Sequence, residues 1–81
     1  MKVLLLKSNG SKANPSVSTF KDLQTLVGGL IECAGRSSNG KFILVNEEGL
    51  IHNLPVNPHL PHLVGDVVLA PQGWAELPHG S

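Results

Sequence analysis

Two of the four histidines in this 81-residue chain have a spacing that metal sites use. His59 and His62 form an H-x-x-H pair, and a zinc site needs three or four nitrogen, sulfur or oxygen ligands in tetrahedral geometry. The other two histidines are His52 and His79, and Cys33, Glu32 and Asp66 are further side chains that can supplement the histidines as ligands. Strong zinc patterns contain two close ligand pairs separated by a spacer, and this sequence has one pair. We therefore expect surface histidines in a loop, with no bound metal and no other cofactor.

Paired carboxylates are a second candidate for chemistry. Two of them can perform acid–base catalysis when a pocket separates their pKa values. Glu32 shares a predicted strand face with apolar residues, so we expect it to be partly buried. The Asn39-Gly40 pair predicts a type I′ hairpin that joins the strand of Glu32 to the following strand. That hairpin brings Glu32 toward Asn46 and Glu47, at the end of the strands away from the turn. The arrangement predicts a polar binding pocket but no catalysis, and hence no enzyme.

Three asparagines flank the predicted strands, and two interpretations of them stay open. Asn46, Asn53 and Asn57 lie in the sequences LVNEEG, HNLP and VNPH. Asparagine is common before a turn or a proline because its side chain bonds to nearby backbone groups. Alternatively, these amides donate and accept hydrogen bonds in a groove that binds a polar ligand or a peptide backbone. In that second interpretation they form one binding site with Glu32 and Glu47.

Cys33 is the only cysteine, so no disulfide can form within the chain, and we expect a cytoplasmic protein. The predicted strand places Cys33 beside Ile31 on the face opposite Glu32. No basic residue adjoins it in sequence to activate a thiolate, so we expect a buried structural thiol. The apolar run Val3–Leu6 is too short for a signal peptide or a membrane span, and no membrane association is expected.

Charge and core size predict the kind of partner. Six lysine and arginine residues balance six aspartate and glutamate residues, with a pI near 6.9. A protein that binds a nucleic acid backbone needs a positive field, so we expect no nucleic acid partner. The aromatic residues are two phenylalanines and one tryptophan, so the core must be aliphatic and thin. Net neutrality and a thin core both favour self-association, and we expect a homo-oligomer.

The hydrophobic pattern predicts a single domain over residues 1–81 with one helix and about five strands. An apolar stripe in residues 20–27 predicts the helix, with Ser18 or Thr19 as its N-cap and Gly28-Gly29 at its end. The strand at residues 2–7 is apolar throughout, so both of its faces should be covered. Further strands are predicted at residues 30–34, 41–46, 50–53 and 66–70, the first three of these forming an antiparallel meander. This order gives an α+β fold, with the helix packed on a small antiparallel or mixed sheet.

Three segments lack a strand pattern. Ser8–Ser16 is polar and turn-rich, and we expect a mobile loop. Leu54–Gly65 contains three prolines, each of which removes a backbone donor, so no regular strand is expected there. Residues 72–81 form a tail that carries the only tryptophan, Trp74. A solvated tryptophan would leave a large apolar ring in water, so we expect it to dock on the sheet or in an interface.

Four short motifs occur in an order that resembles a family of domains. They are VGGLIE, VNEEG, LPVN and GDVV, at Val27–Glu32, Val45–Gly49, Leu54–Asn57 and Gly65–Val68. Together they resemble, over about residues 20–70, a small uncharacterised domain family carried by bacteriophages, mobile elements and gut and actinobacterial genomes. No activity is established for that family, so the resemblance transfers no catalytic residue. It implies a small phage-type protein, of a kind that often binds a host protein or sequesters a nucleotide-type signal.

These features lead to an expected function and an alternative. We expect a non-catalytic binding protein that modulates or inhibits a host process, such as a defence system, by stoichiometric binding of a host protein in the host cytoplasm. The alternative is a homo-oligomeric sponge that sequesters a small polar or nucleotide-type ligand, and a small metal-dependent enzyme ranks below both. A protein partner requires an exposed apolar patch, whereas a small ligand requires a polar cleft with few apolar neighbours.

Overall fold

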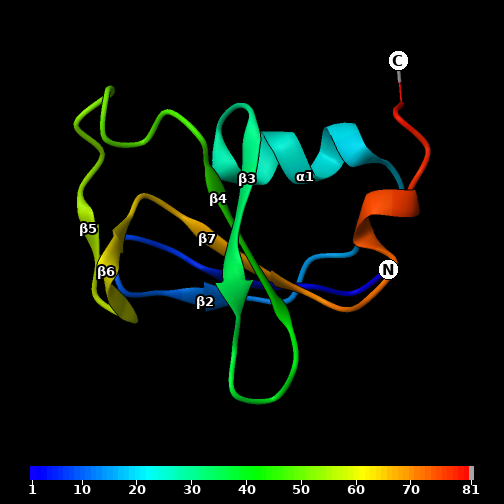
Figure 1. Cartoon of the computed structure of the whole chain (residues 1–81), viewed down its shortest axis with the longest axis horizontal. Helices are drawn as coiled ribbons and strands as arrows, with labels where there is room; N and C mark the ends of the chain where they lie inside the picture. The colour runs from blue at the N-terminus through cyan, green and yellow to red at the C-terminus, as the bar shows by residue number, and fades with distance from the viewer. Residues whose placement is uncertain (81) are drawn as a thin grey trace.

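A computed structural model describes residues 1–80, which form a five-stranded sheet, a two-stranded ribbon and one α-helix (Figure 1). The elements are β1 (Leu4–Leu6), β2 (Lys12–Ala13), α1 (Phe20–Val27), β3 (Ile31–Arg36), β4 (Phe42–Asn46), β5 (Val56–Asn57), β6 (Leu60–Val64), β7 (Val67–Ala70) and the 3-10 helix η1 (Trp74–Glu76). The order in the sheet is β2-β1-β7-β4-β3, with every pair antiparallel, and β5 and β6 form the ribbon. The predicted α+β class is confirmed.

The last strand of the chain lies at the centre of the sheet. Val68 of β7 is the register partner of Leu5 in β1 and of Leu44 in β4. Val67 and Val68 are fully buried, because β7 has a strand on each side and apolar side chains on both faces. β1 also lies inside the sheet, between β2 and β7, as its uninterrupted apolar run predicts.

The helix has the end points that its flanking residues predict. The Thr19 side chain accepts a hydrogen bond from the Asp22 backbone N–H at 3.1 Å. The Asp22 carboxylate accepts from the backbone N–H groups of Ser18 and Thr19, which completes a capping box. These bonds, the one from Ser18 first, lower the pKa of Asp22 below its ordinary value of 3.8. Gly28 ends the helix with a φ of 83°, a left-handed conformation that costs glycine little.

The predicted hairpin of β3 and β4 is present, but its turn is not type I′. The Gly40 N–H donates to the Ser37 carbonyl at 3.0 Å, and Gly40 has a φ of 82°. Asn39 keeps a negative φ, whereas a type I′ turn requires positive φ at both central residues. A bulge between Cys33 and Arg36 then shifts the register of the two strands.

The predicted fourth strand at residues 50–53 is wrong. The Gly49 N–H donates to the Asn46 carbonyl, and the Leu54 N–H donates to the Gly49 carbonyl, so the chain turns here. Asn53 has a φ of 53°, a left-handed conformation that a strand cannot contain. The predicted meander therefore fails after its first hairpin, and β4 takes β7 as its second neighbour.

The proline-rich segment, predicted to be irregular, instead forms the β5–β6 ribbon. Its register partners are Val56 with Val64 and Asn57 with Leu60. Pro61 lies inside β6. Both members of a two-stranded ribbon are edge strands, where a proline is tolerated because the missing N–H can face away from the neighbour.

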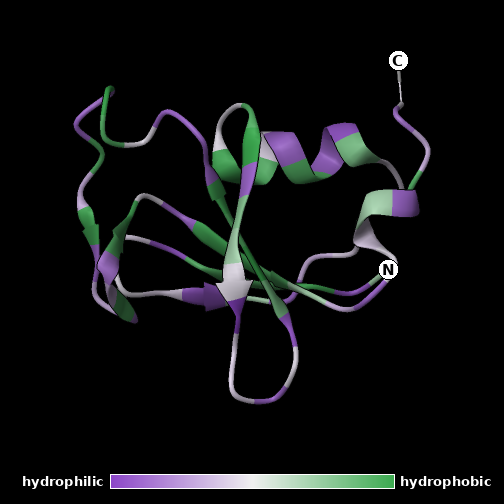
Figure 2. Ribbon diagram, viewed as in Figure 1, coloured by the Kyte–Doolittle hydropathy of each residue, from purple (hydrophilic) through white to green (hydrophobic). Residues whose placement is uncertain are grey.

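Two apolar clusters lie on opposite faces of the sheet, and Figure 2 shows the apolar residues concentrated along the central strands. The cluster beneath α1 consists of Val3, Leu5, Val17, Leu23, Val27, Leu44, Val68 and Ala70. The cluster on the other face consists of Leu6, Ile43, Val45 and Val67. Leu60 and Leu63 of the ribbon pack against this second cluster, so α1 covers one face and the ribbon covers part of the other.

The tail docks on the domain. Trp74 packs against the helix-side cluster, with its ring stacked on Phe20 at 6.3 Å and tilted against Phe42 at 6.2 Å. The backbone N–H groups of Phe20 and Lys21 donate to the carbonyls of Pro78 and His79, which holds the tail at the start of α1. The expectation that the tryptophan is docked is confirmed.

The segment Ser8–Ser16, expected to be a loop, includes β2, which pairs with Leu5 and Leu6 of β1. Within residues 1–80, no helix has the length and apolar character needed to cross a bilayer.

Candidate functional site

The hairpin brings three of the predicted site residues to one end of the sheet. Ile31 is the register partner of Asn46, and Glu32 is the partner of Val45. The Glu47 N–H donates to the Leu30 carbonyl at 2.8 Å, which extends the pairing by one residue beyond β4. Glu32, Asn46 and Glu47 therefore lie close together, as predicted.

These three residues line a hollow of about 310 Å³, which we call the acidic hollow. It lies between the hairpin, the turn after β4, and β6, on the face of the sheet opposite α1. Its ionisable groups are Glu32, Glu47 and His62. Its apolar side chains are Val45, Leu50, Ile51, Leu63 and Val64. The hollow is thus mixed rather than polar.

Two large apolar side chains in this lining are almost fully exposed. Leu50 is 80% exposed and Ile51 is 76% exposed. Both lie in the loop between β4 and β5, a loop whose tip has hydrophobic colouring in Figure 2. The backbone hydrogen bonds of the Gly49 turn hold this tip beside the acidic hollow. Solvent-exposed apolar side chains therefore lie at the rim of the hollow.

The charge of the hollow is negative. Glu32 and Glu47 are both exposed, and no lysine or arginine in the described part of the chain lines the hollow. Within residues 1–80 the only contact of ion-pair length between side chains joins Glu48 to His52, with 3.8 Å between Oε1 and Nε2, and it is an ion pair only when His52 is protonated. Glu32 and Glu47 therefore have no cationic side chain paired with them, and their field is open to a partner.

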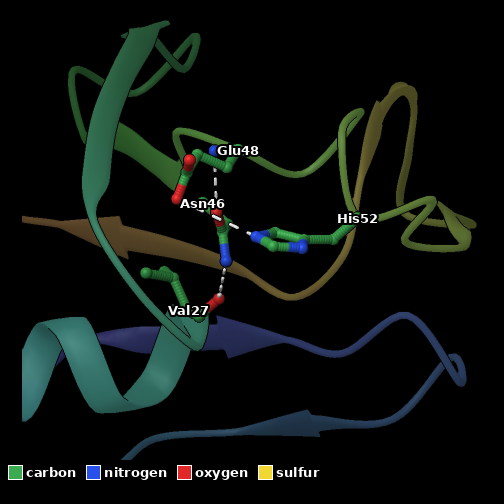
Figure 3. Close-up of polar contacts among 4 residues, drawn as sticks. All are labelled: Val27, Asn46, Glu48 and His52. Atoms are coloured by element: carbon green, nitrogen blue, oxygen red, sulfur yellow. Dashed lines mark hydrogen bonds and ion pairs between the residues drawn. The ribbon is translucent and has the colours of Figure 1, made fainter.

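Asn46 is a structural residue, although it borders the hollow. Its Nδ2 donates to the Val27 carbonyl at 3.2 Å, and its Oδ1 accepts from the Glu48 backbone N–H at 2.8 Å. Figure 3 shows Asn46 between these two residues, with the Glu48–His52 ion pair beside it. The Asn46 amide thus joins the last turn of α1 to the turn after β4.

The other two asparagines lie outside the hollow. Asn57 is fully buried, and its Nδ2 donates to the Leu6 carbonyl at 2.8 Å and to the Gly65 carbonyl at 2.9 Å. Its Oδ1 accepts from the His59 backbone N–H at 2.9 Å. Asn53 is exposed and takes the left-handed turn position. The turn-forming interpretation accounts for the Oδ1 contacts with backbone N–H groups two residues later and for the turn position of Asn53. The Nδ2 contacts with Val27 and Leu6 are long-range and lie outside that interpretation.

One family comparison identifies the domain. A family model described as a domain of unknown function, DUF3846, matches residues 1–77. The chain belongs to the DUF3846 family. No curated protein and no solved structure matches it. The match extends from β1 to η1, so the hollow, the helix and both sheets are all parts of the DUF3846 domain.

Two burial predictions for β3 of the DUF3846 domain are wrong. Cys33 is exposed, although a buried thiol was expected, and Glu32 is exposed rather than partly buried. Both errors have the same cause, because β3 is the outermost strand of the sheet. In this strand only Ile31 packs against the core beneath α1.

The H-x-x-H pair does not converge. His62 lines the acidic hollow, whereas the Nε2 atom of His59 is buried and has no hydrogen-bond partner within residues 1–80. In the same described part of the chain, no group of three or more histidine, cysteine, aspartate or glutamate residues is placed to hold a metal ion.

Sequence reasoning missed Leu50, Ile51 and His62 as site residues. The predicted strand at 50–53 pairs Leu50 and Ile51 into the sheet, and the predicted irregular loop leaves His62 without a defined position. The Glu-Glu-Gly sequence before the first two predicts a turn at residues 47–49, but it carries no signal of how far that turn extends. In the DUF3846 domain this turn continues through Asn53.

Proposed function

We propose that this DUF3846 domain is a non-catalytic binding protein. It binds another protein at the acidic hollow with one partner molecule per chain. The observation that supports this most strongly is the exposure of Leu50 and Ile51 at the rim of the hollow. Single exposed apolar residues are ordinary, but an adjacent pair beside an indentation provides the apolar centre that a protein interface needs. Five apolar side chains in the lining favour this over a small polar ligand.

The chemistry of the partner follows from the charge of the hollow. Glu32 and Glu47 are uncompensated, so a complementary surface presents lysine or arginine beside an apolar side chain. The apolar side chain contacts Leu50 and Ile51 and enters the hollow. The partner surface is therefore basic and apolar.

The biological role that we propose is modulation of a host process, such as a defence system, in the host cytoplasm. It rests on the resemblance to a phage-type family and on the size of the domain, which suits stoichiometric inhibition. Catalysis is a weaker alternative, because Glu32 and Glu47 are both exposed and acid–base chemistry needs environments that separate two pKa values.

The test compares proteins retained from a bacterial extract by the wild-type domain, by the double variant Leu50→Ser/Ile51→Ser and by Val56→Ser. Val56 is 57% exposed and lies outside the hollow, so its substitution is the matched control. We expect a protein that the wild type and the control retain and the double variant loses. Calorimetry with that protein in purified form should then give one binding site per chain. Equal retention by all three would contradict the proposal.

A further inference from the structure

The outer edge of β3 is open. Within residues 1–80, the strand has β4 as its only neighbour in the sheet. Because the Glu47 N–H donates to the Leu30 carbonyl, Leu30 and Glu32 direct their backbone groups toward β4. The alternation of an antiparallel pair then directs the N–H and C=O groups of Ile31 and Cys33 away from the sheet. Such an unpaired row is a template for another strand.

The open edge is short. The register shift between Cys33 and Arg36, with Gly35 at a φ of 123°, ends the regular pairing. Beyond it the Ser37 N–H donates to the Lys41 carbonyl, so the chain turns toward β4. The length from Leu30 to Cys33 therefore suits a short extended segment of a partner rather than a long strand.

This edge and the acidic hollow are continuous. The Glu32 side chain lines the hollow, and its register partner Val45 belongs to the cluster on the ribbon side of the sheet. Side chains of a strand alternate between the two faces. A segment added beside β3 would therefore direct every second side chain toward the hollow, past Glu32.

We propose that the partner binds by strand addition, with an extended segment hydrogen-bonded to Ile31 and Cys33 as a sixth strand of the sheet. This inference rests on the proposed function and specifies how the partner is held. A lysine or arginine of the segment faces Glu32, and an apolar side chain on the same face enters the hollow.

A second copy of this chain fits the edge less well. If two β3 strands paired so that both outward residues were satisfied, Ile31 of one copy would face Cys33 of the other. The two Glu32 side chains would then lie directly opposite each other, and like charges in that position destabilise a strand pair. The uncompensated charge of Glu32 favours a basic segment from a different protein.

The experiment uses the full chain and a fluorescein-labelled peptide selected against it from a displayed library of random sequences. Binding is measured by fluorescence anisotropy for the wild type, Cys33→Pro and Cys33→Ala. Proline removes the outward N–H, whereas alanine keeps it and removes only the thiol. We expect Cys33→Pro to bind about tenfold more weakly and Cys33→Ala to bind like the wild type. Amide hydrogen exchange at Ile31 and Cys33 should slow when the peptide binds, a readout that holds even if Cys33→Pro fails to fold.

The outcomes separate this inference from the proposed function. If exchange at Ile31 and Cys33 is unchanged while Leu50→Ser/Ile51→Ser abolishes binding, strand addition is wrong and the proposed function stands. If no selected peptide depends on Leu50 and Ile51, both are wrong. If exchange at the two amides is already slow without peptide, and the chain is a dimer whose dissociation restores fast exchange, a second copy occupies the edge and the inference is overturned.

Discussion

The Asn57 side chain lies 2.8 Å from the carbonyl oxygen of Leu6, a residue 51 positions earlier in the chain. The same amide nitrogen donates to Gly65, so one side chain holds the β5–β6 ribbon to the end of β1. The ribbon in turn provides His62, Leu63 and Val64 to the acidic hollow. The shape of the hollow therefore depends on this buried amide.

We predict that Asn57→Ala destabilises the domain by about 2–4 kcal/mol, because it leaves the buried carbonyls of Leu6 and Gly65 and the partly buried N–H of His59 without this partner. Urea denaturation of both proteins measures the difference. The control is Asn53→Gly, which should change the stability by less than about 0.5 kcal/mol because glycine readily adopts positive φ. Equal effects of the two substitutions would contradict the structural role of Asn57.

We expect substitution of Asn46 to lower the stability of the domain and substitution of Glu32 to lower its affinity for a peptide. Asn46→Ala removes bonds to Val27 and Glu48, and we expect a loss of about 1–3 kcal/mol with little change in peptide affinity of the folded fraction. Glu32→Gln should leave the melting temperature unchanged and weaken a basic peptide several-fold, an effect that high salt reduces. Melting curves and fluorescence anisotropy on the same samples measure the melting temperature and the peptide affinity. If Glu32→Gln lowers the melting temperature and leaves the affinity intact, Glu32 is not part of the site.

The local elements of this fold could be predicted from the sequence. Thr19 and Asp22 mark the start of α1, Gly28 marks its end, and Asn39-Gly40 marks the hairpin, because each of these signals acts within a few residues. The β5–β6 ribbon could not be predicted in this way. Its stability depends on Asn57 contacting β1, and no local rule shows that a distant carbonyl compensates for three prolines.

The candidate site could be predicted only where local signals determine it. The hairpin alone places Glu32 near Glu47, so that pair follows from local signals. The exposure of Cys33 depends on which strand is outermost in the sheet, and the exposure of Leu50 depends on a turn in place of a strand. Both are decided by the position of β7 between β1 and β4, a pairing between distant segments.

The capping box predicts a specific acid sensitivity. Hydrogen bonds from Ser18 and Thr19 lower the folded pKa of Asp22, whereas the unfolded carboxyl titrates near 3.8. The stabilisation is therefore fully present above about pH 4, declines below it, and is lost once the pH falls below the folded pKa. The melting-temperature difference between wild type and Asp22→Asn should shrink as the pH is lowered through this window. A difference that does not shrink as the pH is lowered below 3.8 would contradict the linkage, and Glu76→Gln is the exposed-carboxylate control.

We still expect the domain to self-associate, because its apolar core is thin. All apolar side chains that are buried within residues 1–80 are aliphatic, and Met1, Leu30 and Val56 remain exposed. An interface that covers part of this surface adds apolar burial that the monomer lacks. We expect light scattering at micromolar concentration to give at least twice the chain mass of 8.6 kDa. Because we propose that the β3 edge binds a different protein, we expect Cys33 to stay reactive toward thiol reagents in that oligomer. A monomer at high concentration would show that the core suffices alone.

Trp74 provides a probe of the docked tail. Its ring is half-buried against Phe20 and Phe42, so its emission in the native state should be blue-shifted relative to free tryptophan. Unfolding in urea should shift the emission to the red, with the same midpoint as the loss of far-ultraviolet circular dichroism. Phe42→Leu should move the native emission toward the red, because the tilted ring contact is lost, whereas Val56→Ser should not. An emission maximum that stays constant through the denaturation transition would mean that the tail does not dock on the sheet in solution.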